Sequence, residues 1–338
     1  MKLVLRRAVV IDARDAADGT EQSLIVEVEG SGEREAVCDT GLLGSCQVGD
    51  EVIVNTQASE LRLGSGGFDI VHVNLTRGLD GAGLPGAHVM KLNYTSLQHA
   101  VEPVEGDQRG ELGGRPVAAC LLHGQLAPLA WAFAQAAPGA RLGLVQGGGG
   151  ALPGNHSRTV ARLREEDLVA GFITASPSYG GEMEAMSVAG ALAFGIEEQG
   201  WDAAVCAPGP GIIGSGSRFG NGALAAADAL CTAVALGARG LLVPRLSDRD
   251  PRERHRGTSH HTFTVAALVP ATVVVPWPEG RADEDIAGLE LRGGAFDIDG
   301  YAASGLPQST MGRSITEDQA FFSGPLAAGS VLGALASG

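Results

Sequence analysis

The sequence is short of positive charge, and of lysine above all. Its 338 residues contain 24 lysines and arginines against 39 aspartates and glutamates, and only Lys2 and Lys91 are lysines. The resulting net charge of −15 would repel a phosphate backbone, whose recognition depends largely on cationic contacts. The composition therefore predicts a protein that does not bind nucleic acid.

Long apolar runs and paired cysteines are missing as well. No uninterrupted apolar run approaches the roughly 20 residues that a membrane helix needs. The segment Met1 to Arg7 lacks the apolar stretch and small-residue cleavage site of a signal peptide. The five cysteines are an odd number without a C-x-x-C pair, which favours reduced, buried thiols. We therefore expect a cytoplasmic protein that does not span a membrane.

Short β-type runs separated by glycine and aspartate turn signals fill the first hundred residues. They are Leu3 to Ile11, Ser23 to Glu29, Glu51 to Asn55 and Phe68 to Asn74. This spacing predicts a small barrel or sandwich. A polar, glycine-containing stretch from Glu102 to Arg115 then precedes a change of pattern. We therefore expect an all-β module over residues 1–110 and a second domain over residues 111–338.

From Pro116 onward, buried-strand patterns alternate with helical patterns. The strand patterns are Val117 to Leu122, Leu142 to Gln146, Gly171 to Thr174, Ala203 to Ala207, Leu241 to Val243 and Ala271 to Val275. The helical patterns are Leu126 to Ala137, Ser157 to Leu168, Met183 to Glu197 and Gly222 to Leu236. This alternation is typical of βαβ units, so the predicted class is α/β, with a Rossmann-like three-layer domain and a mostly parallel sheet.

Polar side chains in this half follow the ends of the predicted strands, the edge at which open α/β sheets bind ligands. The segments that meet there are His123–Gly124, Gly147 to Gly150, Ser176 to Glu182, Gly209 to Gly220 and Arg245 to His261. Five such loops converging on one edge predict a binding site.

Gly209-Pro210-Gly211-Ile212-Ile213-Gly214 matches the dinucleotide pattern G-x-G-x-x-G. It lies on the fourth strand of the half, has proline in its second position, and the next strand ends in Pro244-Arg245 instead of an acid, so we do not expect a nicotinamide or flavin cofactor. The alternatives are an anion site and a structural turn. The candidate ligands of the anion are Gly209, Gly211, Gly214, Ser215, Gly216, Ser217 and Arg218.

The densest polar segment runs from Asp248 to Thr262 and contains His255, His260 and His261. Imidazoles serve as acids, bases or metal ligands near neutral pH, and a solvated charged loop is the alternative interpretation. Because adjacent residues point in different directions on either a helix or a strand, His260 and His261 are not expected to share one metal ion. A divalent metal stays an open alternative, with Asp250 and His255 as its candidate ligands.

Five further residues complete the candidate site. His123 ends an apolar strand, where it is either a buried core histidine or a catalytic group. Glu182 is a second candidate for a general base, or else a first-turn helix residue. Arg245 and Arg256 would add positive charge, and Lys91 is a further candidate in the first half.

The chain resembles an uncharacterised bacterial family, domain of unknown function 3866, over nearly its whole length. The resemblance rests on a set of short segments. They are Gly49 to Thr56, Leu63 to Gly67, His88 to Lys91, Leu122-His123, Gly150 to Pro153, Tyr179 to Glu182, Gly209 to Gly216, Asp250 to His261 and Ser309 to Arg313. The resemblance implies no established activity.

We interpret the protein as an enzyme, with hydrolysis as the first choice, that acts on a small anionic or phosphorylated molecule. No G-x-S-x-G elbow, Walker loop or H-E-x-x-H pair selects one reaction. The alternatives are a non-catalytic ligand-binding or regulatory protein, and a scaffold whose polar loops form the interface of a homo-oligomer.

Overall fold

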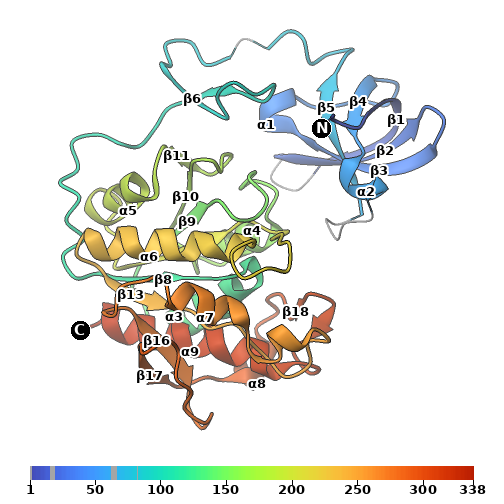
Figure 1. Cartoon of the computed structure of the whole chain (residues 1–338). Helices are drawn as coiled ribbons and strands as arrows, with labels where there is room; N and C mark the ends of the chain where they lie inside the picture. The colour runs from blue at the N-terminus through green and yellow to red at the C-terminus, as the bar shows by residue number, and fades with distance from the viewer. Residues whose placement is uncertain (1, 16–19, 62–66, 82) are drawn as a thin grey trace. The chain divides into compact units, whose positions relative to one another are not determined.

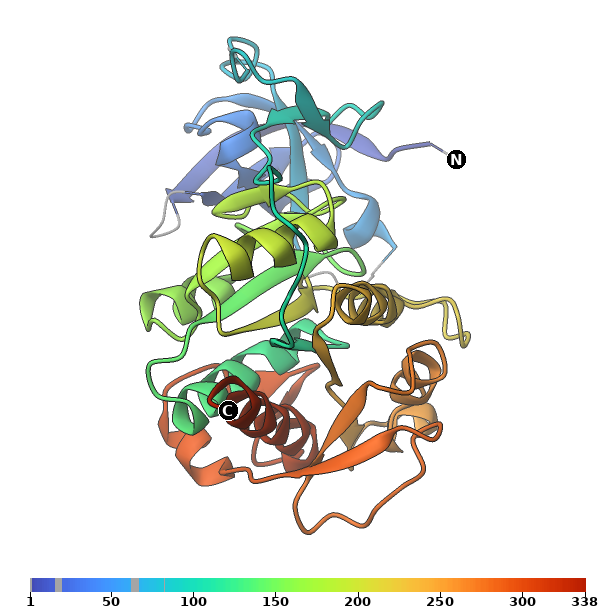
Figure 2. The ribbon, with the colours of Figure 1, turned by 90° about the vertical axis from the view of Figure 1, so that its left-hand side faces the viewer.

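The computed structural model describes residues 2–15, 20–61, 67–81 and 83–338. The chain divides into two compact units, Met1–Val101 and Glu102–Gly338. Of the family pattern quoted above, Leu63 to Gly66 lie outside the described residues. Figures 1 and 2 show the elements of each unit.

The first unit contains a closed five-stranded barrel, which confirms the predicted small all-β module. Its strands follow the order β1-β2-β3-β5-β4, and β4 pairs with β1 to close the barrel. Side chains alternate between the two faces of each strand, so apolar residues such as Val10, Val26 and Val54 fill the interior. The elements are β1 Leu5–Asp15, β2 Glu21–Val28, β3 Gly32–Asp39, α1 Thr40–Leu43, β4 Glu51–Asn55, α2 Gln57–Glu60, β5 Asp69–Asn74, β6 Val89–Lys91 and β7 His99–Val101.

The second unit is built on an eight-stranded parallel sheet of order β11-β10-β9-β12-β8-β13-β16-β17. Its central strands read as continuous apolar runs because helices cover both of their faces. The sheet confirms the predicted class. The strands are β8 Pro116–Ala119, β9 Leu142–Gly147, β10 Gly171–Ala175, β11 Met183–Ala185, β12 Ala203–Pro208, β13 Arg239–Leu242, β16 Val274–Pro278 and β17 Glu290–Gly294.

Helices cover the sheet on two sides (Figures 1 and 2). One layer contains α5 and α6, and α9 packs against α3 in the other. The helices are α3 Leu126–Ala136, α4 Arg158–Glu165, α5 Val188–Glu197, α6 Ala225–Ala235, α7 His260–Ala266, α8 Ile298–Ala303 and α9 Gln319–Ala336. Short elements complete the unit: η1 His123–Gln125, η2 Gly222–Leu224, β14 Leu246–Ser247, η3 Glu253–His255, β15 Gly257–Thr258, β18 Ser309–Thr310 and β19 Arg313–Ser314.

Helix α9 is apolar because it is packed inside the second unit, not because it crosses a membrane. By length and composition it could cross a membrane, but 67% of it is buried inside the protein. Gly329 and Gly333 lie against α3, where a Cβ on Gly329 would come within 2.2 Å of the Leu129 carbonyl oxygen. These small residues let the two helix backbones approach closely, so α9 is a core helix of the second unit.

The polar stretch from Glu102 to Arg115 belongs to the second unit. The backbone N–H groups of Arg109 and Gly110 donate to the carboxylate of Glu197, and Leu112 N–H donates to the Leu236 carbonyl. These bonds attach the stretch to α5 and to the end of α6. The division therefore lies after Val101, whereas the sequence placed it after residue 110.

The centre of the sheet offers a test of its packing. A Cβ added to Gly143 in β9 would lie 1.9 Å from the ring of buried Trp201. We expect Gly143→Ala to lower the free energy of unfolding by about 1–3 kcal/mol or more, measured by urea denaturation, because the ring has to move. Gly293→Ala is the control, since its nearest atom lies at 3.8 Å, and an equal loss in both variants would contradict this account.

Candidate functional site

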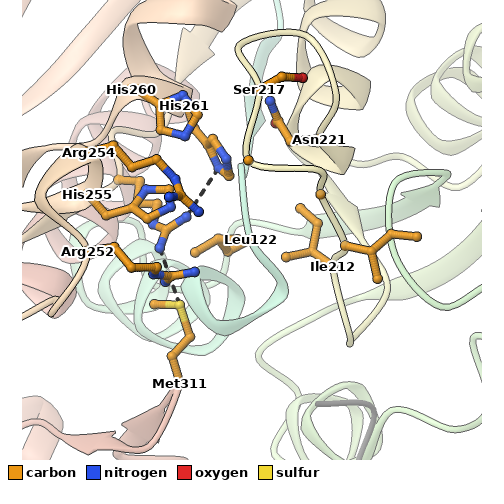
Figure 3. A pocket seen from close by; sticks show the side chains of 14 residues that line it. Leu122, Ile212, Ser217, Asn221, Arg252, Arg254, His255, His260, His261 and Met311 are labelled. Atoms are coloured by element: carbon orange, nitrogen blue, oxygen red, sulfur yellow. Dashed lines mark hydrogen bonds between the residues drawn. The ribbon is translucent and has the colours of Figure 1, made fainter. Parts of the chain in front are cut away.

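A cavity of about 270 Å³ opens at the carboxyl ends of three neighbouring strands of the second unit. Strand β8 lies between β12 and β13 in the sheet, so the segments that follow these strands meet at one edge. Figure 3 shows histidines and arginines on one side of the cavity and the segment from Ile212 to Asn221 on the other. The lining residues are Leu122, Ile212, Ile213, Gly214, Gly216, Ser217, Asn221, Arg245, Arg252, Arg254, His255, His260, His261 and Met311.

Asp250 organises the arginines of this site. Its side chain is fully buried, and its carboxylate accepts hydrogen bonds from Arg252 at 2.9 Å and from Arg245 and Arg313 at 3.3 Å. Burial would raise the pKa of Asp250, but the hydrogen bonds and positive charges of Arg252 and Arg313 outweigh it and hold the pKa well below the ordinary value of 3.8. Asp250 is therefore ionised and ties three guanidinium groups together.

The network continues from Asp250 to the start of α9. Arg313 donates to Asp318 at 3.0 Å, and Asp318 accepts a further hydrogen bond from the Ser247 hydroxyl at 2.5 Å. Ser247 lies in β14, and Asp318 immediately precedes α9. The charged segment after β13 is thus fixed to the body of the unit rather than freely solvated.

Arg245 is the most enclosed cation of the site, with 2% of its surface exposed. Its Nη2 donates to Asp250, and its Nη1 donates to Nδ1 of His261 at 3.2 Å. Burial, followed by the charge of Arg252, lowers the pKa of Arg245 to about 10. The side chain therefore stays charged at neutral pH and points that charge at a histidine.

His255, His260 and His261 come together at the start of α7. Their ring centroids are 4.5 to 4.9 Å apart, and one ligand nitrogen from each lies within 4.8 Å of the other two. The argument that His260 and His261 point apart does not describe these rings, because both lie next to His255. Side chains in the first turn lean beyond the helix N-terminus, and η3 places His255 across from both.

Each imidazole has a different hydrogen-bonding situation. Nδ1 of His255 lies 2.7 Å from the hydroxyl of Ser259, the residue that caps α7. Nδ1 of His261 accepts from Arg245, and Nε2 of His260 is buried with no hydrogen-bond partner among the described residues. Burial, followed by the charge of Arg245, lowers the pKa of both His255 and His261 to about 3. Both rings are therefore neutral at pH 7, with lone pairs to offer.

Asp250 and His255 do not form the metal pair that the sequence suggested. Both oxygens of Asp250 already accept hydrogen bonds from arginines, which would have to leave before a metal could bind. Among the described residues, three other side chains with possible ligand atoms lie together, those of His255, His260 and His261.

The first glycine of the G-x-G-x-x-G match, Gly209, packs against the loop that follows β9. A Cβ on Gly209 would lie 2.1 Å from the Ala151 carbonyl oxygen, and one on Gly150 would lie 2.1 Å from the Gly209 carbonyl oxygen. The next helical turn begins only at Gly222, so the segment does not lead directly into a helix as a dinucleotide site requires. Gly214, Gly216 and Ser217 line the cavity, and Gly209, Gly211, Ser215 and Arg218 are absent from its lining within the described chain.

The other sequence candidates lie outside the lining. His123 Nδ1 donates to the Pro208 carbonyl at 3.0 Å, which leaves Nε2 to accept from the Ser157 hydroxyl at 2.8 Å. Glu182 binds the guanidinium of Arg164 and the backbone N–H of Phe172. These contacts give both side chains structural partners. Arg256 is exposed, and Lys91 lies in β6 of the first unit.

Sequence reasoning missed several residues of the lining. Arg252 and Arg254 belong to the dense polar segment, and their i, i+2 spacing gave no reason to prefer them to Arg256. Met311 belongs to the Ser309–Arg313 segment that carried the family resemblance, and its sulfur lies 3.5 Å from Nη2 of Arg245. Leu122, Ile212 and Asn221 have side chains whose type gives no functional signal.

Comparison with known proteins gives one match. The model of a family described as a protein of unknown function (DUF3866) matches residues 35–329. No curated protein and no solved structure matches the chain. The chemistry of the cavity therefore has to be argued from its own residues.

Removing the Asp250 carboxylate should destabilise the second unit strongly. In Asp250→Asn, buried Arg245 loses its counter-charge, and we expect the free energy of unfolding to fall by about 3–5 kcal/mol in urea denaturation. Asp248→Asn is the matched control, because Asp248 is 64% exposed and lies 3.8 Å from Arg281, so its loss should stay below about 1 kcal/mol. Similar losses in the two variants would contradict the central role of Asp250.

The neutral histidines predict a pH dependence of stability. Between pH 6.5 and about 3, His255 and His261 are neutral in the folded protein but protonated in the unfolded chain. The stability of the folded state is therefore not reduced by these two histidines above pH 6.5. As the pH falls toward 3, the free energy of unfolding decreases by up to about 1.4 kcal/mol per pH unit for each histidine.

Urea unfolding at several pH values in the presence of a chelator measures this slope. The double variant His255→Gln, His261→Gln should show a shallower decline in stability with acid than the natural sequence. An unchanged slope would show that the two rings are protonated equally in the folded and unfolded states.

Proposed function

The chain belongs to the DUF3866 family, and we propose that its second unit is a hydrolase that acts on a small anionic, phosphorylated or carboxylated substrate. The observation that carries the proposal is the charge of the cavity. Arg245, Arg252 and Arg254 line it, and no carboxylate does so among the described residues, in a chain whose net charge is −15. A cationic recess in an acidic protein concentrates anions at that point.

Arg254 is the cation best placed to bind an added anion. It donates no hydrogen bond and forms no ion pair within the described residues, whereas Arg252 and Arg245 are both tied to Asp250. The two tied guanidinium groups hold positive charge in fixed positions, and Arg254 adds free donors. Ser217 and Asn221 offer further polar groups on the opposite wall.

The histidines supply the reactive groups that hydrolysis needs. In this reaction the oxygen of water forms a bond to carbon or phosphorus, the bond to the leaving oxygen breaks, and a proton of water ends on the leaving group. Neutral imidazoles can accept that proton or bind an ion that polarises the water. The loop-packing role of Gly209 argues against hydride transfer from a dinucleotide, which would need the glycine loop for its phosphates.

We also propose that the protein works in the cytoplasm. The support is chemical, because its five cysteines are free thiols, and four of them are buried.

Replacing Arg254 should weaken anion binding while leaving the fold intact. We expect Arg254→Ala to weaken the binding of inorganic phosphate by about tenfold to a hundredfold in isothermal titration calorimetry, which corresponds to one charge-assisted hydrogen bond. Arg218→Ala is the control, because Arg218 belongs to the same predicted anion segment but stacks on Phe219, outside the lining.

The same proteins should be assayed for phosphate release from a panel of phosphorylated metabolites. If the natural sequence releases phosphate and Arg254→Ala releases it more slowly, the result supports the hydrolase. Phosphate binding without any turnover would favour the non-catalytic alternative, and equal binding losses in the Arg254 and Arg218 variants would overturn the assignment of the cavity.

A further inference from the structure

We propose that His255, His260 and His261 together bind one divalent metal ion of the zinc class, and that this ion displaces the hydrogen bond from Arg245 to His261. The catalytic use of the ion rests on the function proposed above, whereas the metal site rests on the geometry of the three rings alone. Neither family membership nor the sequence pattern assigns this site.

The nitrogens are close to the spacing that such an ion requires. One nitrogen of each ring lies within 4.8 Å of the other two. Three nitrogens held at 2.0–2.1 Å from a tetrahedral ion are roughly 3.3 Å apart, so each ring has to move by about an ångström or less. We expect rotations about the side-chain bonds of the three residues to supply this movement.

Two of the rings already present a suitable nitrogen. Nε2 of His260 is buried with no hydrogen-bond partner among the described residues. When Nδ1 of His255 donates its proton to the Ser259 hydroxyl, 2.7 Å away, Nε2 of His255 is left with a lone pair. A metal-binding histidine commonly donates its other N–H in this way, which fixes the ring.

The third ring connects metal binding to Arg245. Nδ1 of His261 accepts a hydrogen bond from Nη1 of Arg245. If the ion binds Nδ1, it takes the place of Arg245. If it binds Nε2, the ring proton has to move to Nδ1, which then faces the N–H of Arg245 as a second donor. In either case the metal and the Arg245 hydrogen bond exclude each other.

The donor set selects the class of ion. Three neutral imidazole nitrogens suit Zn²⁺ and its neighbours Co²⁺ and Ni²⁺, whereas Mg²⁺ and Ca²⁺ require oxygen ligands. Neutral ligands leave the charge of the ion uncompensated beside Arg245 and Arg252. An anion in the cavity would relieve this repulsion, which agrees with an anionic substrate. A fourth coordination position would accept water, whose pKa zinc lowers.

Metal titration of the chelator-stripped full chain tests the site. We expect one Co²⁺ per chain, with the visible absorption of a tetrahedral nitrogen site, and one Zn²⁺ in competition with a chromophoric chelator. His260→Asn and His255→Asn should each weaken Zn²⁺ binding by at least about a hundredfold, beyond the roughly 10–100-fold that loss of an outer partner costs. His72→Asn, in the barrel strand β5, should leave the affinity unchanged.

Arg245→Met gives the sharper test, because a purely structural role of Arg245 would not predict that its removal increases the affinity for Zn²⁺. Removing the competing donor and its charge should tighten Zn²⁺ binding, and Asp250 keeps Arg252 and Arg313 as partners. Circular dichroism checks that the variant is folded. Weaker Zn²⁺ binding by folded Arg245→Met would overturn the proposed competition, and absence of binding, or binding indifferent to His255 and His260, would overturn the site.

Phosphate titration in the presence of the chelator separates this inference from the proposed function. Phosphate binding to a chain that binds no Zn²⁺ would remove the metal site and leave the anion site standing. Zn²⁺ binding to a chain that binds no phosphate would remove the anion site and leave the metal site standing.

Discussion

Asp250 accepts hydrogen bonds from Arg245, Arg252 and Arg313 in the interior of the second unit, and the geometry of the cavity depends on this one carboxylate. Three guanidinium groups would repel each other if they were gathered without a counter-charge, and a lone buried carboxylate would be protonated or expelled to water. Together they form a rigid cationic wall. Because Arg313 also binds Asp318 at the start of α9, the wall is anchored to the core helix that packs on α3.

The strand order of the sheet decides what faces this wall. Strand β8 lies between β12 and β13, so the segments that follow these three strands meet at its carboxyl end, although Leu122 precedes Arg245 by 123 residues in the sequence. Leu122 comes from the first segment, Ser217 and Asn221 from the second, and the arginines and histidines from the third. The segments that follow β9 and β10 supply no residue to the lining within the described chain. The first packs its glycines against the backbone of the β12 loop.

The histidine cluster and the arginine wall impose opposite requirements on each other. Positive charge and burial keep the imidazoles neutral, which preserves the lone pairs that bind a proton or a metal ion. The same positive charge disfavours a bound cation until an anion arrives. Under the two proposals, an anion binds through Arg254 and a metal ion binds through the three histidines in competition with Arg245.

The sequence by itself determined the layered α/β class and four of the five barrel strands, and it missed β3. Periodicity of apolar residues and turn residues is a local property, and it identified β8, β9, β10, β12 and β13 and most of the covering helices. It did not separate β11 from the helix that follows it, because Met183 to Ala185 is only three residues long and adjoins a helical pattern. The sequence also singled out the polar segment from Asp248 to Thr262, which contributes five residues to the lining of the cavity.

Tertiary structure decided which of those polar side chains meet. Spacing along the chain could not show that Asp250 turns inward to three arginines, one of them 63 residues away. Nor could it show that η3 brings His255 over the first turn of α7, where adjacent His260 and His261 converge despite their angular separation. Long-range packing set these contacts, since a buried charge is stable only where partners from distant segments complete its hydrogen bonds.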